Sequence, residues 1–222
     1  MMQAPWWRGV VMAVLFCAVA MAAEGDRPDP APLVVPVMRE APEIDGRIGE
    51  EEWRVSASFD GFQRGGRLER RRVQGFVAAR GDTIYVAIRS QLPDEGELRA
   101  EIKRDSLRVV HDDSVEVYVN PAPRASDNVD YQMLANSLGH GGYNIHTLGR
   151  PEEKVSWRGD WEQAHGFHDG YWHLECAIPV ESMGTAGAGR KVTEGLWRIN
   201  LTRNWKRPWR WSSLAGGYAR GG

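Results

Sequence analysis

Residues 111–121 read HDDSVEVYVNP, and this stretch carries the strongest fold signal in the chain. Valines at positions 115, 117 and 119 alternate with Glu116 and Tyr118, so side-chain character repeats every two residues. Valine and tyrosine favour the pleated surface of a sheet. The stretch therefore predicts a strand of an antiparallel sheet, with one apolar face and one polar face.

Other segments predict further strands that are joined by short turns. Residues 73–80 and 83–90 flank Gly81-Asp82, and residues 161–168 and 171–178 flank Asp169-Gly170. An Asp-Gly turn favours a two-residue hairpin, which would place Phe167 opposite Trp172. Residues 33–39 are expected to form a first strand, and residues 49–53 a short helical turn that buries Trp53. Because no segment keeps a helical period, the expected fold is all-β, an antiparallel β-sandwich of immunoglobulin-like type.

Five short motifs follow one another along the chain. They are APEIDG at 41–46 followed by Trp53, GDTIYVA at 81–87, DSVE at 113–116, GYWHLECAIP at 170–179, and GLWRIN at 195–200 followed by Arg203 and Trp211-Ser212. In this order they resemble the family 9 carbohydrate-binding modules and their DOMON-related relatives, over about residue 34 to the C-terminus. The resemblance implies the same β-sandwich and non-catalytic binding of a carbohydrate. It also implies a final F-G-x-L strand after Gly221-Gly222, so either the reading frame is truncated or the expected sandwich lacks its last strand.

The resemblance further implies a sugar ring held between two tryptophans, with an arginine and an asparagine beside it. In this sequence Val110 stands at the first tryptophan position and Leu134 at the arginine position. Asn136 matches the asparagine, and Tyr218 stands near the second stacking position. The set implied by the family is thus half present.

Tryptophan is abundant, with 10 residues in the chain, two of them in the first 23 positions. Trp53, Trp172 and Trp197 lie on apolar stripes, which predicts core positions. The remaining five stand among polar residues: Trp157, Trp161, Trp205, Trp209 and Trp211. They either stack on sugar rings, whose C–H faces are apolar, or cap the ends of the sandwich.

The predicted carbohydrate site takes its stacking surface from Trp209, Trp211 and Tyr218. Asn136 and Arg203 are predicted to hydrogen-bond to the sugar hydroxyls. The rival interpretations are a haem-binding electron-transfer domain of the same sandwich type and a structural cell-surface module.

The first 23 residues predict a signal peptide, with Arg8 ahead of an apolar run and a small-x-small site near residue 22. An uncleaved anchor is the alternative. Residues 24–32 read as an acidic, proline-rich linker, and residues 33–222 as the module. The protein is expected to be secreted, periplasmic or on the cell surface, with no membrane span in its mature form. Export would leave Cys176 alone, so no intramolecular disulfide is expected.

Charge argues against a nucleic-acid partner. The net charge is −2 for the 222 residues, and removal of residues 1–23 leaves about −3. Nucleic-acid binding requires a basic surface. The expected partner is a glycan.

Cofactors and catalysis have weaker support in the sequence. Calcium could bind loop aspartates at Asp112, Asp127 or Asp130, although no EF-hand spacing is present. His168 and His173 share one face of a hairpin but lack further zinc ligands. No cofactor is therefore expected.

Haem would need axial ligands, for which Met133 with Lys206 or His146 are the candidates, although a methionine in a strand more often packs in a core. Glu116 and Glu175 lie on polar strand faces, and no nucleophile or phosphate-loop motif accompanies them. The chain is therefore not expected to be an enzyme.

Overall fold

The computed structural model describes residues 34–94, 98–121, 129–147, 157–183, 191–193, 196–206 and 209–214. The described residues belong to one unit of the chain. Of the described residues, none lies in a helix with the length and hydrophobicity that a membrane span requires.

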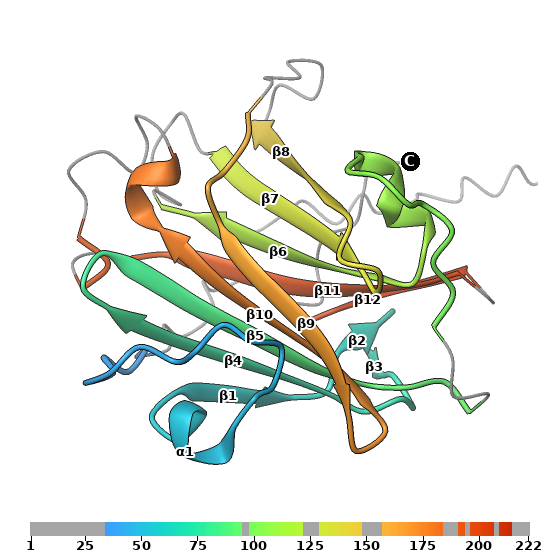
Figure 1. Cartoon of the computed structure of the whole chain (residues 1–222), viewed down its shortest axis with the longest axis horizontal. Coiled ribbons are helices and arrows are strands. Elements are labelled where there is room, and N and C mark those ends of the chain that lie inside the picture. Colours follow the sequence, from blue (N-terminus) through green and yellow to red (C-terminus); the bar gives the residue numbers. More distant parts are fainter. Residues whose placement is uncertain are drawn as a thin grey trace, which may run out of the picture. The chain divides into compact units, whose positions relative to one another are not determined.

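Two antiparallel sheets make up this unit (Figure 1), which confirms the predicted β-sandwich. Within the described residues, one sheet has five strands, in the order β1 (Ala57–Asp60), β4 (Val73–Arg80), β5 (Thr83–Gln91), β10 (Tyr171–Pro179) and β9 (Glu162–His168). The other has seven, in the order β3 (Arg67–Leu68), β2 (Gln63–Arg64), β12 (Trp209–Ser213), β11 (Arg198–Lys206), β6 (Ser114–Asn120), β7 (Val129–Asn136) and β8 (Gly141–Thr147). Short helical segments are α1 (Glu50–Trp53), η1 (Leu107–His111) and η2 (Val180–Met183).

The predicted hairpins are confirmed. Strands β9 and β10 meet at Asp169-Gly170 and pair Phe167 with Trp172, as expected from a two-residue turn. Asp169 itself has a positive φ of 51°, which an aspartate tolerates in a tight turn. The predicted first strand over 33–39 is wrong, because among the described residues this segment makes only one parallel bridge, between Val37 and Ala79.

The core lies between the two sheets. The three alternating valines of β6 are fully buried there, and Trp172, Cys176 and Leu201 pack around them. Burial raises the pKa of the Cys176 thiol, which therefore stays protonated and unreactive. Strand β6 is buried on its polar face as well, which its alternating sequence does not predict.

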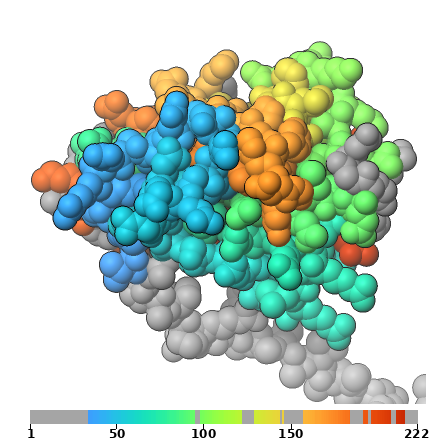
Figure 2. Space-filling model, turned by 60° about the horizontal axis from the view of Figure 1, so that its bottom comes forward, coloured from blue at the N-terminus to red at the C-terminus, as the bar shows by residue number. Residues whose placement is uncertain are grey.

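The outer face of the five-stranded sheet is covered by the segment that carries the APEIDG motif and α1. The carboxylate of Glu175, on β10, accepts hydrogen bonds from the Gly46 N–H at 2.9 Å and the Trp53 indole N–H at 2.7 Å. Gly46 has a φ of +88°, and a Cβ there would lie 2.4 Å from the backbone of His165, so only glycine fits. Figure 2 shows this N-terminal segment in blue against the orange strands. The segment from the APEIDG motif to Trp53 is thus held against the outer face of the five-stranded sheet by Glu175, and we call this segment the clamp.

Glu175 is fully buried, and burial raises its pKa, although the hydrogen bonds from Trp53 and Gly46 oppose the rise. A second contact of the clamp runs from the Ile48 N–H to His173 Nδ1, at 3.1 Å. His173 is 3% exposed, and burial lowers its pKa to about 4, helped by the nearby charge of Arg89. The native structure therefore holds His173 neutral, because only the neutral ring can accept this hydrogen bond.

We expect His173 to make stability depend on pH between about 6.5 and 4. The unfolded chain binds a proton below pH 6.5, whereas folded His173 does so only near pH 4. Native stability is therefore complete above pH 6.5 and falls as the pH drops, by up to about 3 kcal/mol from this group. In His173→Asn the amide oxygen can replace Nδ1 as acceptor without titrating. Urea unfolding between pH 7 and pH 4 should then show a flatter dependence than in the wild type.

Exposed His111, on η1, provides the control, since His111→Asn should keep the wild-type pH dependence. Glu175 is present in all three proteins, so its own titration cancels in the comparison. Equal slopes for the wild type and His173→Asn would contradict the role assigned to His173.

Candidate functional site

The outer face of the seven-stranded sheet carries a continuous set of polar side chains, which we call the polar face. Even-numbered positions of β6, β7 and β11 point to it, because the valines of β6 point to the core. Strand register aligns its members in rows, one of which contains Asn136, Ser114, Asn204 and Trp211. The buried polar members are Ser114, Glu116, Tyr118, Asn120, Asp130, Gln132, Asn136, Asn200, Thr202, Asn204 and Ser213.

Glu116 lies at the centre of the polar face and is fully buried. Its carboxylate accepts hydrogen bonds from the Tyr118 hydroxyl at 2.6 Å, from the Asn204 amide at 2.6 Å and from the Gln132 amide. All of these donors are neutral, and no lysine or arginine among the described residues forms an ion pair with Glu116. Burying a carboxylate without a cation is costly, and the three hydrogen bonds offset part of that cost.

Thr202 lies next to Glu116 in the same row of the sheet. Its hydroxyl oxygen is buried and has no hydrogen-bond partner among the described residues. A buried hydroxyl without a partner carries a desolvation penalty that a ligand hydroxyl would remove. Glu116 and Thr202 together therefore place a carboxylate and a hydroxyl side by side on the polar face.

The two ends of the polar face are partly open to solvent. At one end Trp211 is partly exposed, and Lys206 pairs with Glu101 at 2.6 Å while keeping 20% of its side chain exposed. At the other end Arg198, 38% exposed, donates to Asp130 at 2.8 Å. Trp211 supplies an aromatic surface at the first of these ends.

Trp211 and Asn136 lie in one row of the polar face, but β11 and β6 separate them, so the structure does not bring these two predicted residues into contact. Asn136 is fully buried, and its amide donates to Asp112 at 3.0 Å and to the Ile102 carbonyl at 2.9 Å. Its oxygen accepts from the N–H groups of Leu138 and His140. Its hydrogen bonds thus hold neighbouring loops.

Asp112 and Asp113 of the HDDSVEVYVNP stretch also hold a loop. Asp112 accepts from the N–H groups of Glu101 and Ile102, and Asp113 from that of Arg99. Burial alone would raise the pKa of Asp112, but these backbone donors and the Asn136 amide lower it. Both aspartates therefore anchor residues 99–102 beside β6.

Arg203 lies on the opposite side of the sheet from Asn204, between the two sheets. Its guanidinium donates to Ser90 Oγ at 3.2 Å and to the carbonyls of Arg71 and Arg72 at 3.1 and 3.2 Å. It also lies 4.4 Å from the ring centre of Trp205. Arg203 is fully buried, and burial lowers its pKa to about 9. Arg203 and Trp211 therefore lie on opposite sides of the seven-stranded sheet. Arg203 connects the two sheets through its hydrogen bonds, and we call this structural role the brace.

The structure describes only some of the other predicted site residues. Trp209 belongs to β12, where its backbone pairs with Lys206, but its side chain lies outside the described set, as does all of Tyr218. Val110 lies in η1. Leu134 is 2% exposed and is the register partner of Glu116, so an apolar side chain borders the carboxylate where the family resemblance implies an arginine.

The structure describes some of the metal and haem ligand candidates. The described residues contain no group of three or more potential metal ligands. The rings of His168 and His173 lie 5.2 Å apart, but His173 Nδ1 already accepts the hydrogen bond from Ile48. Met133 is buried in the core, on the opposite side of the sheet from Lys206. Asp127 and the side chain of His146 lie outside the described residues.

Sequence reasoning missed Gln132, Thr202 and Asn204 as site residues. Their signal was their alternation with apolar neighbours, but only the register of β11 against β6 places Thr202 beside Glu116. The register between these strands is not a local property of the sequence.

The fold is similar to solved structures of carbohydrate-binding proteins. One, from Bacteroides uniformis ATCC 8492, is proposed to bind carbohydrate; it shares 15% identity over 80% of this chain and 85% of that one, with a TM-score of 0.62. Family 9 carbohydrate-binding modules from Caldicellulosiruptor kristjanssonii, in complexes with cellotriose and with glucose, share 14% and 13% identity and a TM-score of 0.54 each. They cover 81% and 80% of this chain, and 83% of each module is matched.

No family model matches the sequence, and no curated protein matches it. The likeness to the solved structures therefore shows the fold, and it confirms the fold resemblance expected from the five motifs. The chain has the β-sandwich fold of the family 9 carbohydrate-binding modules.

Proposed function

We propose that this protein is a non-catalytic carbohydrate-binding protein that holds a sugar on the polar face of its seven-stranded sheet. The observation that carries the proposal is the buried carboxylate of Glu116, which among the described residues accepts only from neutral donors and lies beside the hydroxyl of Thr202, which has no hydrogen-bond partner in the same part of the chain. Sugar hydroxyls both donate and accept hydrogen bonds, so they suit this mixture of carboxylate, amide and hydroxyl groups.

Trp211 supplies the apolar part of the proposed site. It lies in the row of Asn204, at a partly exposed end of the polar face. A pyranose ring stacked there would place its hydroxyls toward Asn204 and Glu116. Trp209 and Tyr218 remain predicted stacking residues. Asn136 and Arg203 support the site through the loops and sheets that they hold.

The positions of the carboxylates support a binding role rather than hydrolysis. A glycosidase needs two carboxyl groups about 5–10 Å apart across the scissile bond. Glu116 and Glu175 project from the outer faces of different sheets. They cannot flank one glycosidic bond, so sugar recognition without cleavage is the function proposed.

The ligand class and cellular context complete the proposal. Cellotriose and glucose occupy the two similar modules, so neutral glucose oligomers are the first ligands to test. The N-terminal signal peptide predicted from residues 1–23 would export the protein. A secreted, periplasmic or surface sugar binder would then act in polysaccharide breakdown, together with a catalytic partner or a larger parent protein.

We expect Glu116→Gln to weaken cellotriose binding by about 10- to 100-fold, since a hydrogen bond to a charged acceptor contributes about 1.5–3 kcal/mol. Isothermal titration of the full chain with cellotriose measures the change. Trp211→Ala should also weaken binding, because the stacking surface is lost. Affinity should be unaffected by a calcium chelator.

Glu162→Gln is the matched control, because Glu162 is exposed on β9 of the other sheet. It should bind cellotriose like the wild type. If Glu116→Gln keeps its fold, as judged by circular dichroism, and still binds cellotriose with wild-type affinity, the polar face is not the site. If the wild-type protein binds neither a glucose oligomer nor any other glycan on an array, the proposed carbohydrate-binding function is contradicted.

A further inference from the structure

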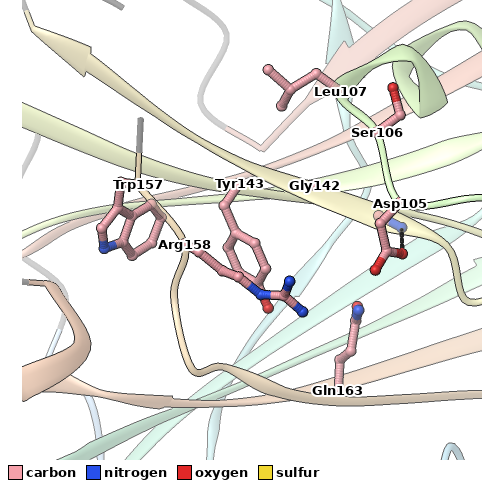
Figure 3. Close-up of a pocket in the computed structure, with 9 residues that line it drawn as sticks. Asp105, Ser106, Leu107, Gly142, Tyr143, Trp157, Arg158 and Gln163 are labelled. Atoms are coloured by element: carbon pink, nitrogen blue, oxygen red, sulfur yellow. Dashed lines mark hydrogen bonds between the residues drawn. The ribbon is translucent and has the colours of Figure 1, made fainter. Parts of the chain in front are cut away.

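A cleft opens at the edge of the sandwich, where β8 of one sheet faces the segment that leads into β9 of the other (Figure 3). Its volume is about 290 Å³. Ligand pockets usually range from about 300 to 1,000 Å³, so this cleft lies at the lower limit and suits only a small ligand, such as one sugar ring. It is separate from the polar face, because Tyr143 of β8 points to the core side of its sheet, beside Met133.

One wall of the cleft is aromatic and fixed in place. Trp157 and Tyr143 meet edge to face, with ring centres 5.5 Å apart and an angle of 86°. The Trp157 indole N–H donates to the Ser182 carbonyl at 2.9 Å, and Trp161 packs against both rings. Because their polar atoms are engaged within the protein, these rings offer a preorganised apolar surface to a ligand.

The opposite side of the cleft is polar and carries no net charge. Asp105 contributes a carboxylate and Arg158 a guanidinium, and both side chains are exposed. Gln163, on β9, has a buried amide oxygen without a hydrogen-bond partner among the described residues. Figure 3 shows Arg158 and Gln163 projecting into the same opening as Asp105. Hydrogen-bond donors and acceptors thus line the cleft beside its apolar wall.

The floor of the cleft depends on glycine. The Ser106 N–H donates to the Gly141 carbonyl at 2.8 Å, which brings residues 105–107 onto β8. A Cβ on Gly142 would lie 3.0 Å from the backbone of Ser106 and Leu107. Close backbone approach keeps Asp105 at the rim, where its carboxylate accepts from the Gly141 N–H at 3.3 Å.

We infer that this cleft is a second carbohydrate site, which takes one neutral pyranose unit against Trp157 and Tyr143, with Gln163, Arg158 and Asp105 holding its hydroxyls. A neutral ligand is favoured because the two charges of the cleft have opposite sign. A hydroxyl-rich ligand is favoured because the cleft offers both donors and acceptors. The site stands independently of the polar face, and it would make the protein bivalent toward a polysaccharide.

The test uses the full chain carrying Glu116→Gln, so that binding at the polar face is weakened, and methyl β-glucoside as the probe in titration calorimetry. Adding Gln163→Met should weaken the remaining binding at least tenfold. The same change should leave the free energy of unfolding unchanged or raised, because it removes a buried oxygen that has no partner. Glucuronate and glucosamine should bind more weakly than the neutral glucoside.

Arg158→Gln is a second variant that leaves the aromatic wall intact, and it should also weaken binding. Its matched control is Arg64→Gln, an exposed arginine at the hairpin of β2 and β3. If Glu116→Gln alone abolishes all binding, the cleft is not a sugar site and the polar face is the site that binds. Binding that survives Glu116→Gln and is unaffected by Gln163→Met and Arg158→Gln would overturn the cleft as well. Binding that is lost only with Gln163→Met or Arg158→Gln would support the cleft and contradict the polar face.

Discussion

Replacing Glu175 with alanine is expected to lower the free energy of unfolding by about 3–4 kcal/mol. The change leaves the Gly46 N–H and the Trp53 indole N–H buried without an acceptor, and each such donor costs about 1–3 kcal/mol. Relief of the buried charge offsets part of this loss. Urea unfolding at pH 7 measures the difference.

Two further proteins make the Glu175 test specific. Glu175→Gln keeps one acceptor oxygen but turns an NH₂ group toward the second donor, so an intermediate loss is expected. Glu162→Ala, on the neighbouring strand, removes an exposed glutamate and should change stability by less than about 0.5 kcal/mol. If Glu175→Ala unfolds at the same urea concentration as Glu162→Ala, the clamp does not depend on Glu175.

Replacing Arg203 with methionine is expected to lower the free energy of unfolding by about 2–4 kcal/mol. Ser90 Oγ and the carbonyls of Arg71 and Arg72 would lose their donors, and the contact with Trp205 would be lost as well. Methionine fills much of the volume, so the loss reflects the missing hydrogen bonds rather than a cavity. The same unfolding measurement applies.

The control for Arg203 is Arg210→Met on the adjacent strand, where the arginine is exposed and its backbone pairs with Trp205. That protein should match the wild type within about 0.5 kcal/mol. A stable Arg203→Met protein that no longer binds sugar would contradict the brace and restore Arg203 to the ligand site. A destabilised protein would support the position seen between the sheets.

Local sequence signals predicted the parts of the fold that depend on near neighbours. The Asp169-Gly170 turn fixed the register of β9 and β10, because a two-residue loop leaves no freedom in pairing. The bridge at Val37 was predicted wrongly as part of a full strand. Its partner, Ala79, comes from a distant segment that the local pattern cannot reveal.

The site was harder to predict, because it depends on the faces of strands and on register. Arg203 follows Leu201 with a period of two, so its position on the core side was readable from sequence, but its polarity suggested a ligand role. Thr202 and Asn204 become candidate site residues only because β11 pairs with β6 and places them beside Glu116, and this pairing joins segments that are distant in the sequence. The polar residue types predicted which side chains could hydrogen-bond to a sugar. The pairing of the strands determines which of these side chains lie next to one another.

The most direct test of sugar binding on the polar face is the NMR spectrum of side-chain amides in the full chain, recorded with and without cellotriose. The Gln163→Met background weakens binding at the cleft beside Trp157 and Tyr143. We expect the amide signals of Asn204 and Gln132 and the indole signal of Trp211 to shift on addition of the sugar, and the indole signal of Trp53 to stay in place. If cellotriose leaves the Asn204 and Gln132 signals unchanged at saturating concentration, the polar face does not hold the sugar.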